Sequence, residues 1–214
     1  MAHAEKTVVI NRPVRSVFDF VLNGANNRLW RSSVMDIKPL SEAPYGVGSK
    51  FQQGLKGPGG RIPGDYEIME VQPNELIRFQ VTAGPVRPTG TYHFESQGAA
   101  TALMFVLDYQ PNGLSKQMDP VETQQVFREA LRVAKEEDAS VLEHLSQQEK
   151  HVLQLGSEGK SNREISMSLS LGEGTIRNYI FSILSKVMDP MIQRSMNEEV
   201  GMLDELKAFM EKHA

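Results

Sequence analysis

The chain has 214 residues, 40% hydrophobic and 23% charged, a balance typical of a soluble globular protein with one or two domains. The absence of cysteine excludes disulfide frameworks, thiolate nucleophiles and cysteine-rich zinc sites. The net charge of −4 neither indicates nor excludes DNA binding, because the acid is concentrated in residues 117–145 and 188–214. We find neither an apolar run of membrane-spanning length nor a signal-peptide core, so we expect a cytoplasmic protein with no membrane partner.

Residues 1–116 predict an antiparallel sheet. Thr7–Ile10 is a β-branched run, and Val14–Leu22 has apolar residues on one helical face. Six further strands are expected between proline and glycine breaks, at Met35–Pro39, Lys50–Leu55, Asp65–Gln72, Leu76–Ala83, Gly90–Glu95 and Thr101–Tyr109. In the last strand both alternating sets of side chains are apolar, which predicts that the strand is covered on both faces, or on one face by a cavity wall.

Three short helices are predicted within residues 145–187, after an acidic helix over Asp119–Leu142. Ser146 and Glu149 form a capping-box pattern at the first helix, and Ser161 is placed to cap the second. The third has a buried stripe made of Ile176, Ile180, Ile183, Leu184 and Val187. Two helices across a short turn, the second with polar residues facing outward, is the geometry that places a helix in the DNA major groove.

A last helix is predicted over Pro190–Lys212, because apolar residues recur there at intervals of three and four. An antiparallel sheet of this kind needs a long helix on its concave side, and residues 1–116 end without one. The heptapeptides LSKQMDP and LSKVMDP, at 114–120 and 184–190, flank the segment in between. This near-repeat at both ends is what the junctions of an insertion would leave.

Residues 145–187 resemble a LuxR-type helix-turn-helix. The positions in register with that family are Leu145, Ser146, Glu149, Val152, Leu153, Leu155, Gly159, Ser161, Asn162, Glu164, Ile165, Leu169, Thr175, Ile176, Ile183, Lys186 and Val187. Tyr179, Gly172 and Ser166 depart from its usual His, Ser and Ala. The resemblance implies binding of double-stranded DNA, with bases read by Arg177, Asn178 and Phe181 and phosphates met by Lys160, Asn162, Thr175 and Lys186.

The rest of the chain resembles the START-like (SRPBCC) superfamily, which includes polyketide cyclases. The segments that carry the likeness are PVRSVFDFVLNGANNRLW, GSKF, GDYEIMEVQPNELIRFQ, GTYHFE and the C-terminal helix. The fold class expected is α+β, a helix-grip antiparallel sheet with a long C-terminal helix and an inserted all-α domain. The expected boundaries are 1–116 and 188–214 for the helix-grip domain, 117–144 for an acidic connector helix and 145–187 for the helix-turn-helix.

This resemblance implies a pocket for a small hydrophobic ligand. We expect it to be lined by Phe18, Trp30, Phe51, Tyr66, Phe79, Tyr92, Phe105, Tyr109, Met196 and Leu203, although each suits ordinary core packing as well. Arg78 and His93 are placed to orient a polar ligand group, but an outward-facing role is favoured for both.

No catalytic constellation, metal-ligand motif or cofactor is indicated, and GPGG at 57–60 lacks the lysine of a phosphate loop. Two functions stay open. One is a ligand-sensing transcription regulator that acts as a homodimer. The other is a small-molecule-binding or cyclase-like protein with a passenger helix-turn-helix, natural or engineered. The first is favoured by the intact family positions in 145–187. The second is favoured by the lack of a separate dimerisation helix after Val187, where Pro190–Lys212 lies instead.

Overall fold

A computed structural model describes residues 2–57, 60–84, 86–110, 120–136 and 139–213. The chain divides into two compact units. The first, called here the sheet unit, comprises Met1–Gln110 and Ser195–Ala214, and the second, the helical unit, comprises Pro111–Arg194. Each unit is described by itself.

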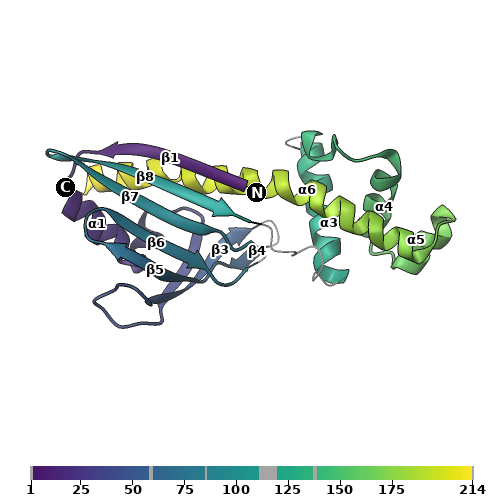
Figure 1. The fold of residues 1–214 in the computed structure, drawn as a ribbon, viewed down its shortest axis with the longest axis horizontal. Coiled ribbons are helices and arrows are strands. Elements are labelled where there is room, and N and C mark those ends of the chain that lie inside the picture. Colours follow the sequence, from purple (N-terminus) through teal and green to yellow (C-terminus); the bar gives the residue numbers. More distant parts are fainter. Residues whose placement is uncertain (1, 58–59, 85, 111–119, 137–138, 214) are drawn as a thin grey trace. The chain divides into compact units, whose positions relative to one another are not determined.

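The sheet unit contains an eight-stranded antiparallel sheet with short helices between its first two strands (Figure 1). Its strands are β1 (Ala2–Ile10), β2 (Val34–Pro39), β3 (Lys50–Gly57), β4 (Gly60–Pro63), β5 (Tyr66–Gln72), β6 (Leu76–Val81), β7 (Thr89–Gln97) and β8 (Ala100–Tyr109). The helices are α1 (Val14–Leu22), the 3-10 turn η1 (Gly24–Asn26) and α2 (Asn27–Trp30). The strand order is β1-β8-β7-β6-β5-β3-β2, with β4 paired to β3.

Strand β8 shows how the sheet divides its two faces. Leu103, Phe105, Leu107 and Tyr109 are buried, whereas the alternate side chains Met104 and Val106 are half-buried. One face of β8 is therefore fully covered and the other only in part, so the expectation that both faces are covered holds for one of them.

The C-terminal part of the chain covers the concave face of this sheet. The end of α6 (Glu173–Gly201) and all of α7 (Leu203–Lys212) belong to the sheet unit and run along β1 and β8 (Figure 1). Their buried side chains are Met196, Val200, Leu203, Leu206 and Met210. Lys6 of β1 also donates to the Asp204 carboxylate of α7 at 2.5 Å. The predicted helix-grip arrangement of sheet and closing helix is thus confirmed.

The helical unit contains α3 (Pro120–Glu136), the 3-10 turn η3 (Ala139–Leu142), α4 (Gln147–Ser157), α5 (Asn162–Leu169) and the first part of α6. Phe127 of α3 is fully buried in its core. Phe127 lies so close to Gly156 of α4 that a Cβ atom there would come within 2.7 Å of the ring. Arg128 also donates to the Ser157 carbonyl oxygen at 2.8 Å, at the end of α4. The acidic helix therefore packs as part of the helix-turn-helix core.

The third predicted helix and the first part of the last one form a continuous helix, α6, with Pro190 inside it. The rest of the last predicted helix is the separate α7. The sequence predicted two separate helices here, one ending at Val187 and one beginning at Pro190. Proline lacks the N–H that an interior helical residue donates. Apolar side chains are buried on both sides of Pro190, with Val187 before it and Ile192 after it. This packing holds the helix together across the lost hydrogen bond. Residues 114–119 of the first heptapeptide and residues 58–59 of GPGG lie outside the described residues.

The strand β4 was not predicted, and β1 begins five residues before the expected start at Thr7. Both departures occur where small residues (Ala2, Ala4, Gly60) weaken the apolar alternation on which the prediction depended. Among the described helices, none combines the length and the apolar character needed to cross a membrane.

Candidate functional site

Two capping boxes fix the helices that precede α6. At α4 the Glu149 N–H donates to the Ser146 hydroxyl, and at α5 the Glu164 N–H donates to the Ser161 hydroxyl, both at 3.3 Å. The turn between α5 and α6 contains Ser170 in the left-handed conformation, at φ 55°. The backbone N–H of Leu171 then donates to the Ser166 carbonyl oxygen at 3.0 Å. These contacts define a tight helix-turn-helix from α5 into α6.

One side of α6 faces the core of the helical unit and the other is exposed. Ile176, Ile183 and Val187 are fully buried. The three predicted base-reading residues, Arg177, Asn178 and Phe181, are all exposed, and Phe181 is 41% exposed. The exposed side of α6 therefore presents a guanidinium, an amide and an aromatic ring to solvent, while the opposite side packs against the core of the helical unit.

A buried carboxylate links α4 to α6. Glu149 accepts from the Lys186 ammonium at 2.8 and 2.9 Å, from the Ser182 hydroxyl at 2.7 Å and from the Ser146 N–H at 2.8 Å. Burial alone would raise the pKa of this carboxyl. The hydrogen bonds from Lys186, Ser182 and Ser146 outweigh burial and lower the pKa of Glu149 to about 2. The sequence marked Glu149 as a cap but gave no signal of this ion pair.

The four residues predicted to meet phosphates differ in their surroundings. Lys160 and Thr175 are exposed, and Asn162 at the start of α5 is half-buried. The Lys186 ammonium is paired with Glu149, so its charge is directed into the helical unit.

The interior of the sheet unit contains a row of aromatic rings that crosses five strands. Phe51 stacks on Tyr66 with ring centroids 5.0 Å apart, and Tyr92 stacks on Phe105 at 4.3 Å. Phe79 lies between these pairs, 5.3 Å from Tyr66 and 5.9 Å from Tyr92. Gly90, opposite Phe79 in the ladder, leaves room for that ring, because a Cβ atom there would come within 2.1 Å of it.

All ten predicted pocket residues are buried in the sheet unit. The structure brings Phe51, Tyr66, Phe79, Tyr92 and Phe105 together in the aromatic row just described. Phe18 of α1 instead packs edge-on against Phe94 of β7, with centroids 5.2 Å apart.

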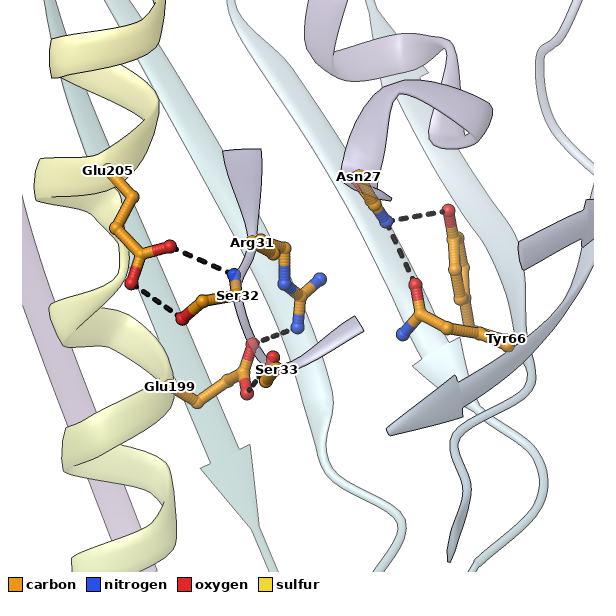
Figure 2. A network of polar contacts seen from close by, with 8 residues as sticks. Asn27, Arg31, Ser32, Ser33, Tyr66, Glu199 and Glu205 are labelled. Atoms are coloured by element: carbon orange, nitrogen blue, oxygen red, sulfur yellow. Dashed lines mark hydrogen bonds and ion pairs between the residues drawn. The ribbon is translucent and has the colours of Figure 1, made fainter. Parts of the chain in front are cut away.

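A polar network that the sequence did not single out lies beside the aromatic row (Figure 2). Arg31, only 7% exposed, donates to the carboxylate of Glu199 on α6. The Ser33 hydroxyl donates to the same carboxylate at 3.4 Å. Glu205 of α7 accepts from the Ser32 N–H at 2.9 Å and from its hydroxyl at 2.8 Å. Two carboxylates of the C-terminal helices thus bind three successive residues that precede β2.

Glu199 gave one signal in the sequence that could have revealed this network. It lies three residues after Met196 and four before Leu203, in phase with the buried stripe of the closing helix. A carboxylate in that position has to find a buried partner. Nothing in the sequence identifies the partner, since Arg31 is 168 positions away.

Electrostatics within this interior favour a charged arginine and neutral tyrosines. Burial works against the charge of Arg31, but the nearby Glu199 and tyrosines raise its pKa above the ordinary value. Burial raises the pKa of Tyr92 to about 12, and it raises that of Tyr66 further. The Tyr66 hydroxyl accepts from the Asn27 amide at 3.3 Å, which leaves its own O–H able to donate (Figure 2).

The two polar candidates on the strands lie away from this network. Arg78 donates to the Glu70 carboxylate of the neighbouring strand at 2.5 Å, in a pair that is partly exposed, and His93 is half-buried. Within the described ranges no cluster of three or more His, Asp or Glu side chains could hold a metal ion.

The fold and these sites define a two-unit α+β protein, a helix-grip sheet combined with a helix-turn-helix. Residues 1–137 match the family described as "Polyketide cyclase / dehydrase and lipid transport". The chain belongs to this family. Residues 143–188 match the family described as "Bacterial regulatory proteins, luxR family", so the chain carries a LuxR-type DNA-binding domain.

Similarity to a curated protein is limited to a short stretch of the chain. The "Transcriptional regulatory protein DesR" of Bacillus subtilis (strain 168) is 49% identical to the chain over 43 residues. This match covers 20% of the chain and 22% of that protein. The chain thus spans about a fifth of the length of this relative.

Three solved structures that match the chain share little sequence with it. The Zhui aromatase/cyclase from Streptomyces sp. R1128 is 16% identical with a TM-score of 0.45, over 50% of this chain and 67% of that one. A START superfamily protein from Mycobacterium smegmatis is 15% identical with a TM-score of 0.46, over 51% and 77% of the two chains. The protein TTHA0849 from Thermus thermophilus is 16% identical with a TM-score of 0.46, over 64% and 88%.

Proposed function

We propose that the chain is a transcription regulator that binds double-stranded DNA through the helical unit and a small hydrophobic ligand through the sheet unit. The observation that carries this proposal is the exposed side of α6. It presents Arg177, Asn178 and Phe181 to solvent, opposite the fully buried side chains of Ile176, Ile183 and Val187. The match to the LuxR family over 143–188 supports the same role.

Each exposed side chain has a distinct partner chemistry in the major groove. The Arg177 guanidinium suits the O6 and N7 atoms of guanine, and the Asn178 amide suits the N6 and N7 atoms of adenine. The Phe181 ring suits the methyl group of thymine. Lys160, Thr175 and Asn162 are proposed to contact phosphates, which fixes the position of α6 without specifying sequence.

The ligand part of the proposal depends on the interior of the sheet unit. Five rings form a nearly continuous apolar surface across β3 to β8, and the hydroxyls of Tyr66 and Tyr92 add polar tips. Apolar walls with a few oriented polar groups are typical of sites for small hydrophobic molecules.

One observation favours the second candidate function, a ligand-binding or cyclase-like protein whose helix-turn-helix does not read DNA. LuxR-type domains pair through a fourth helix that follows the third. Here α6 continues past Val187 to Gly201, and its last residues belong to the sheet unit. Under this alternative the chain is monomeric and has no preferred DNA sequence, whereas the regulator is proposed to bind two half-sites as a homodimer.

The two candidates are separated by selection from a random double-stranded DNA pool, followed by mobility-shift titrations at fixed salt. The regulator is expected to enrich one motif. Arg177→Ala should then weaken binding to that motif by about 1–3 kcal/mol and relax the preference at one base pair. Lys160→Ala, the matched control, should weaken binding to all sequences alike and reduce the salt dependence. Failure to enrich any motif would contradict the regulator and leave the second candidate.

A further inference from the structure

Arg31 carries a positive charge in the interior of the sheet unit. Its side chain is 7% exposed, and its guanidinium is paired with Glu199, whose side chain is 19% exposed. A buried guanidinium is stable only when an anion and hydrogen-bond acceptors accompany it. The pair is asymmetric, because the cation is buried and the carboxylate partly reaches solvent. Glu199 is thus the partner that can leave.

The hydrogen-bonding capacity at this place is not filled. The Nε atom of Arg31 and the Nε1 atom of Trp30 are buried and donate to no acceptor among the residues that the structure describes. The Cζ atom of Arg31 lies 5.6 Å from the centre of the Trp30 ring, so the two side chains are neighbours. Buried donors are nearly always satisfied in native proteins. Two unsatisfied donors, one on the Arg31 guanidinium and one on the neighbouring Trp30 ring, point to an acceptor that comes from outside the chain.

The surroundings of Arg31 are aromatic. Tyr66 and Tyr92 both lie close enough to influence its charge, and each stacks on a phenylalanine of the row, Phe51 and Phe105. A molecule bound here would thus meet an apolar surface at its body and positively charged, hydrogen-donating groups at one end.

We propose that Arg31 binds the carboxylate of an apolar organic acid and that this carboxylate takes the place of Glu199. This inference rests on the proposed ligand-binding function of the sheet unit and names the chemical class of its ligand. In the free protein Glu199 acts as an internal substitute for the ligand's acid group. On binding, one anion replaces another, so the Arg31 charge stays neutralised, while the donors of Arg31 and Trp30 gain an acceptor. The displaced Glu199 turns to the solvent that it already touches.

The test compares acids with neutral amides of the same shape. Decanoate is paired with decanamide and 2-naphthoate with 2-naphthamide, and each is titrated into the full chain by calorimetry. Trp30 is the single tryptophan, so its fluorescence reports directly on the site with the aliphatic pair, which does not absorb at its wavelengths. At least one acid is expected to bind about tenfold more tightly than its amide, the ratio for one charge-assisted hydrogen-bonded contact.

Three substitutions test whether Arg31 is the source of the preference for acid over amide. Arg31→Gln should remove the preference for acid over amide, and Glu199→Gln should strengthen acid binding about tenfold without changing amide binding. Glu205→Gln is the matched control, because this neighbouring carboxylate binds Ser32 rather than Arg31, and it should leave the preference unchanged. Circular dichroism verifies folding. If Glu199→Gln does not fold, Glu199→Asp keeps the charge but shortens the side chain, and a smaller gain in acid affinity is expected.

The outcomes separate this inference from the function on which it rests. Equal affinities for acid and amide would overturn the role of Arg31 and leave ligand binding in the sheet unit intact. A preference for acids that survives Arg31→Gln would place the acid elsewhere and would also overturn the inference. Binding of none of the four probes would contradict both the inference and the ligand-binding function.

Discussion

At the scale of single residues, the ion pairs Glu149–Lys186 and Arg31–Glu199 differ in how fully the hydrogen-bonding capacity of the buried partner is used. Glu149 in the helical unit is bound by Lys186, Ser182 and Ser146, so its hydrogen-bonding capacity is well used. Arg31 in the sheet unit keeps an unsatisfied Nε atom. A satisfied buried pair stabilises a unique packing, whereas a cation with capacity to spare is suited to exchange its partner. We therefore expect substitution of Glu149 to affect mainly stability and substitution of Arg31 to affect mainly ligand recognition.

Glu149→Gln is expected to destabilise the helical unit by about 2–3 kcal/mol at pH 7, because the amide cannot form the ion pair that the buried Glu149 carboxylate makes with Lys186. The pKa of Glu149 is about 2 in the folded protein and 4.5 ordinarily, so the unfolded chain binds the proton more tightly. The stability it contributes is complete above about pH 5 and is lost as the pH falls from about 4.5 towards 2. Urea unfolding followed by circular dichroism at pH 7 and pH 3 measures this loss in the wild type.

Glu164→Gln provides the control for that measurement. Glu164 occupies the same capping-box position in α5, is exposed, and has no lysine partner among the described contacts. Glutamine can replace glutamate in a capping box, so a much smaller effect is expected at both pH values. A Glu149→Gln protein with wild-type stability at pH 7 would show that the ion pair only offsets its own desolvation.

At the scale of elements, the close approach of α3 and α4 depends on a glycine. Gly156→Ala is expected to cost about 1–3 kcal/mol, since the added methyl group would overlap the Phe127 ring within 2.7 Å. Gly201→Ala is the opposite case, because no atom lies within 4 Å of a Cβ there, and a gain of up to about 1 kcal/mol is expected. Thermal unfolding of the wild type and of both variants measures these changes in stability. A Gly156→Ala protein more stable than the wild type would show that α3 does not pack against α4 as described.

Local sequence patterns predicted most elements, and they failed where tertiary contacts decide. The strands β5 to β8 and the helices α4 and α5 follow from alternation, helical spacing and capping residues within a few positions. The prediction of separate helices, one ending at Val187 and one beginning at Pro190, was wrong, because local spacing does not show that one helix continues through the proline.

The candidate sites were predictable to different degrees for the same reason. Exposure of Arg177 and Asn178 follows from the helical phase of the isoleucines around them, which is local information. The Arg31–Glu199 and Glu149–Lys186 pairs join residues far apart in the chain, and no spacing rule connects them. Family resemblance supplied the positions of aromatic residues but not this polar network.

At the scale of the whole molecule, the insertion of the helix-turn-helix remains a prediction that deletion can test. Removing residues 117–186 joins Lys116 to Val187 and leaves the sheet-unit elements β1 to β8, the end of α6 and α7 in the chain. We expect the shortened protein to unfold cooperatively, to keep any acid preference that depends on Arg31, and to lose DNA binding. Aggregation or absence of a cooperative transition would mean that the two parts share one core.

The continuity of α6 has a consequence for rotation. Arg177 of the helical unit and Glu199 of the sheet unit both belong to α6, 22 positions apart along the chain. In a continuous helix, one alanine added between Arg194 and Ser195 shifts the helical phase of the residues after it by about 100°, while seven added residues restore the phase to within about 20°.

If a bound acid alters DNA affinity through α6, this response should disappear with one added residue and return in large part with seven, as measured by mobility shift with and without decanoate. A wild-type response no larger than experimental error would mean that the units do not communicate. Equal responses from the two insertions would mean that the signal does not travel as a twist of this helix.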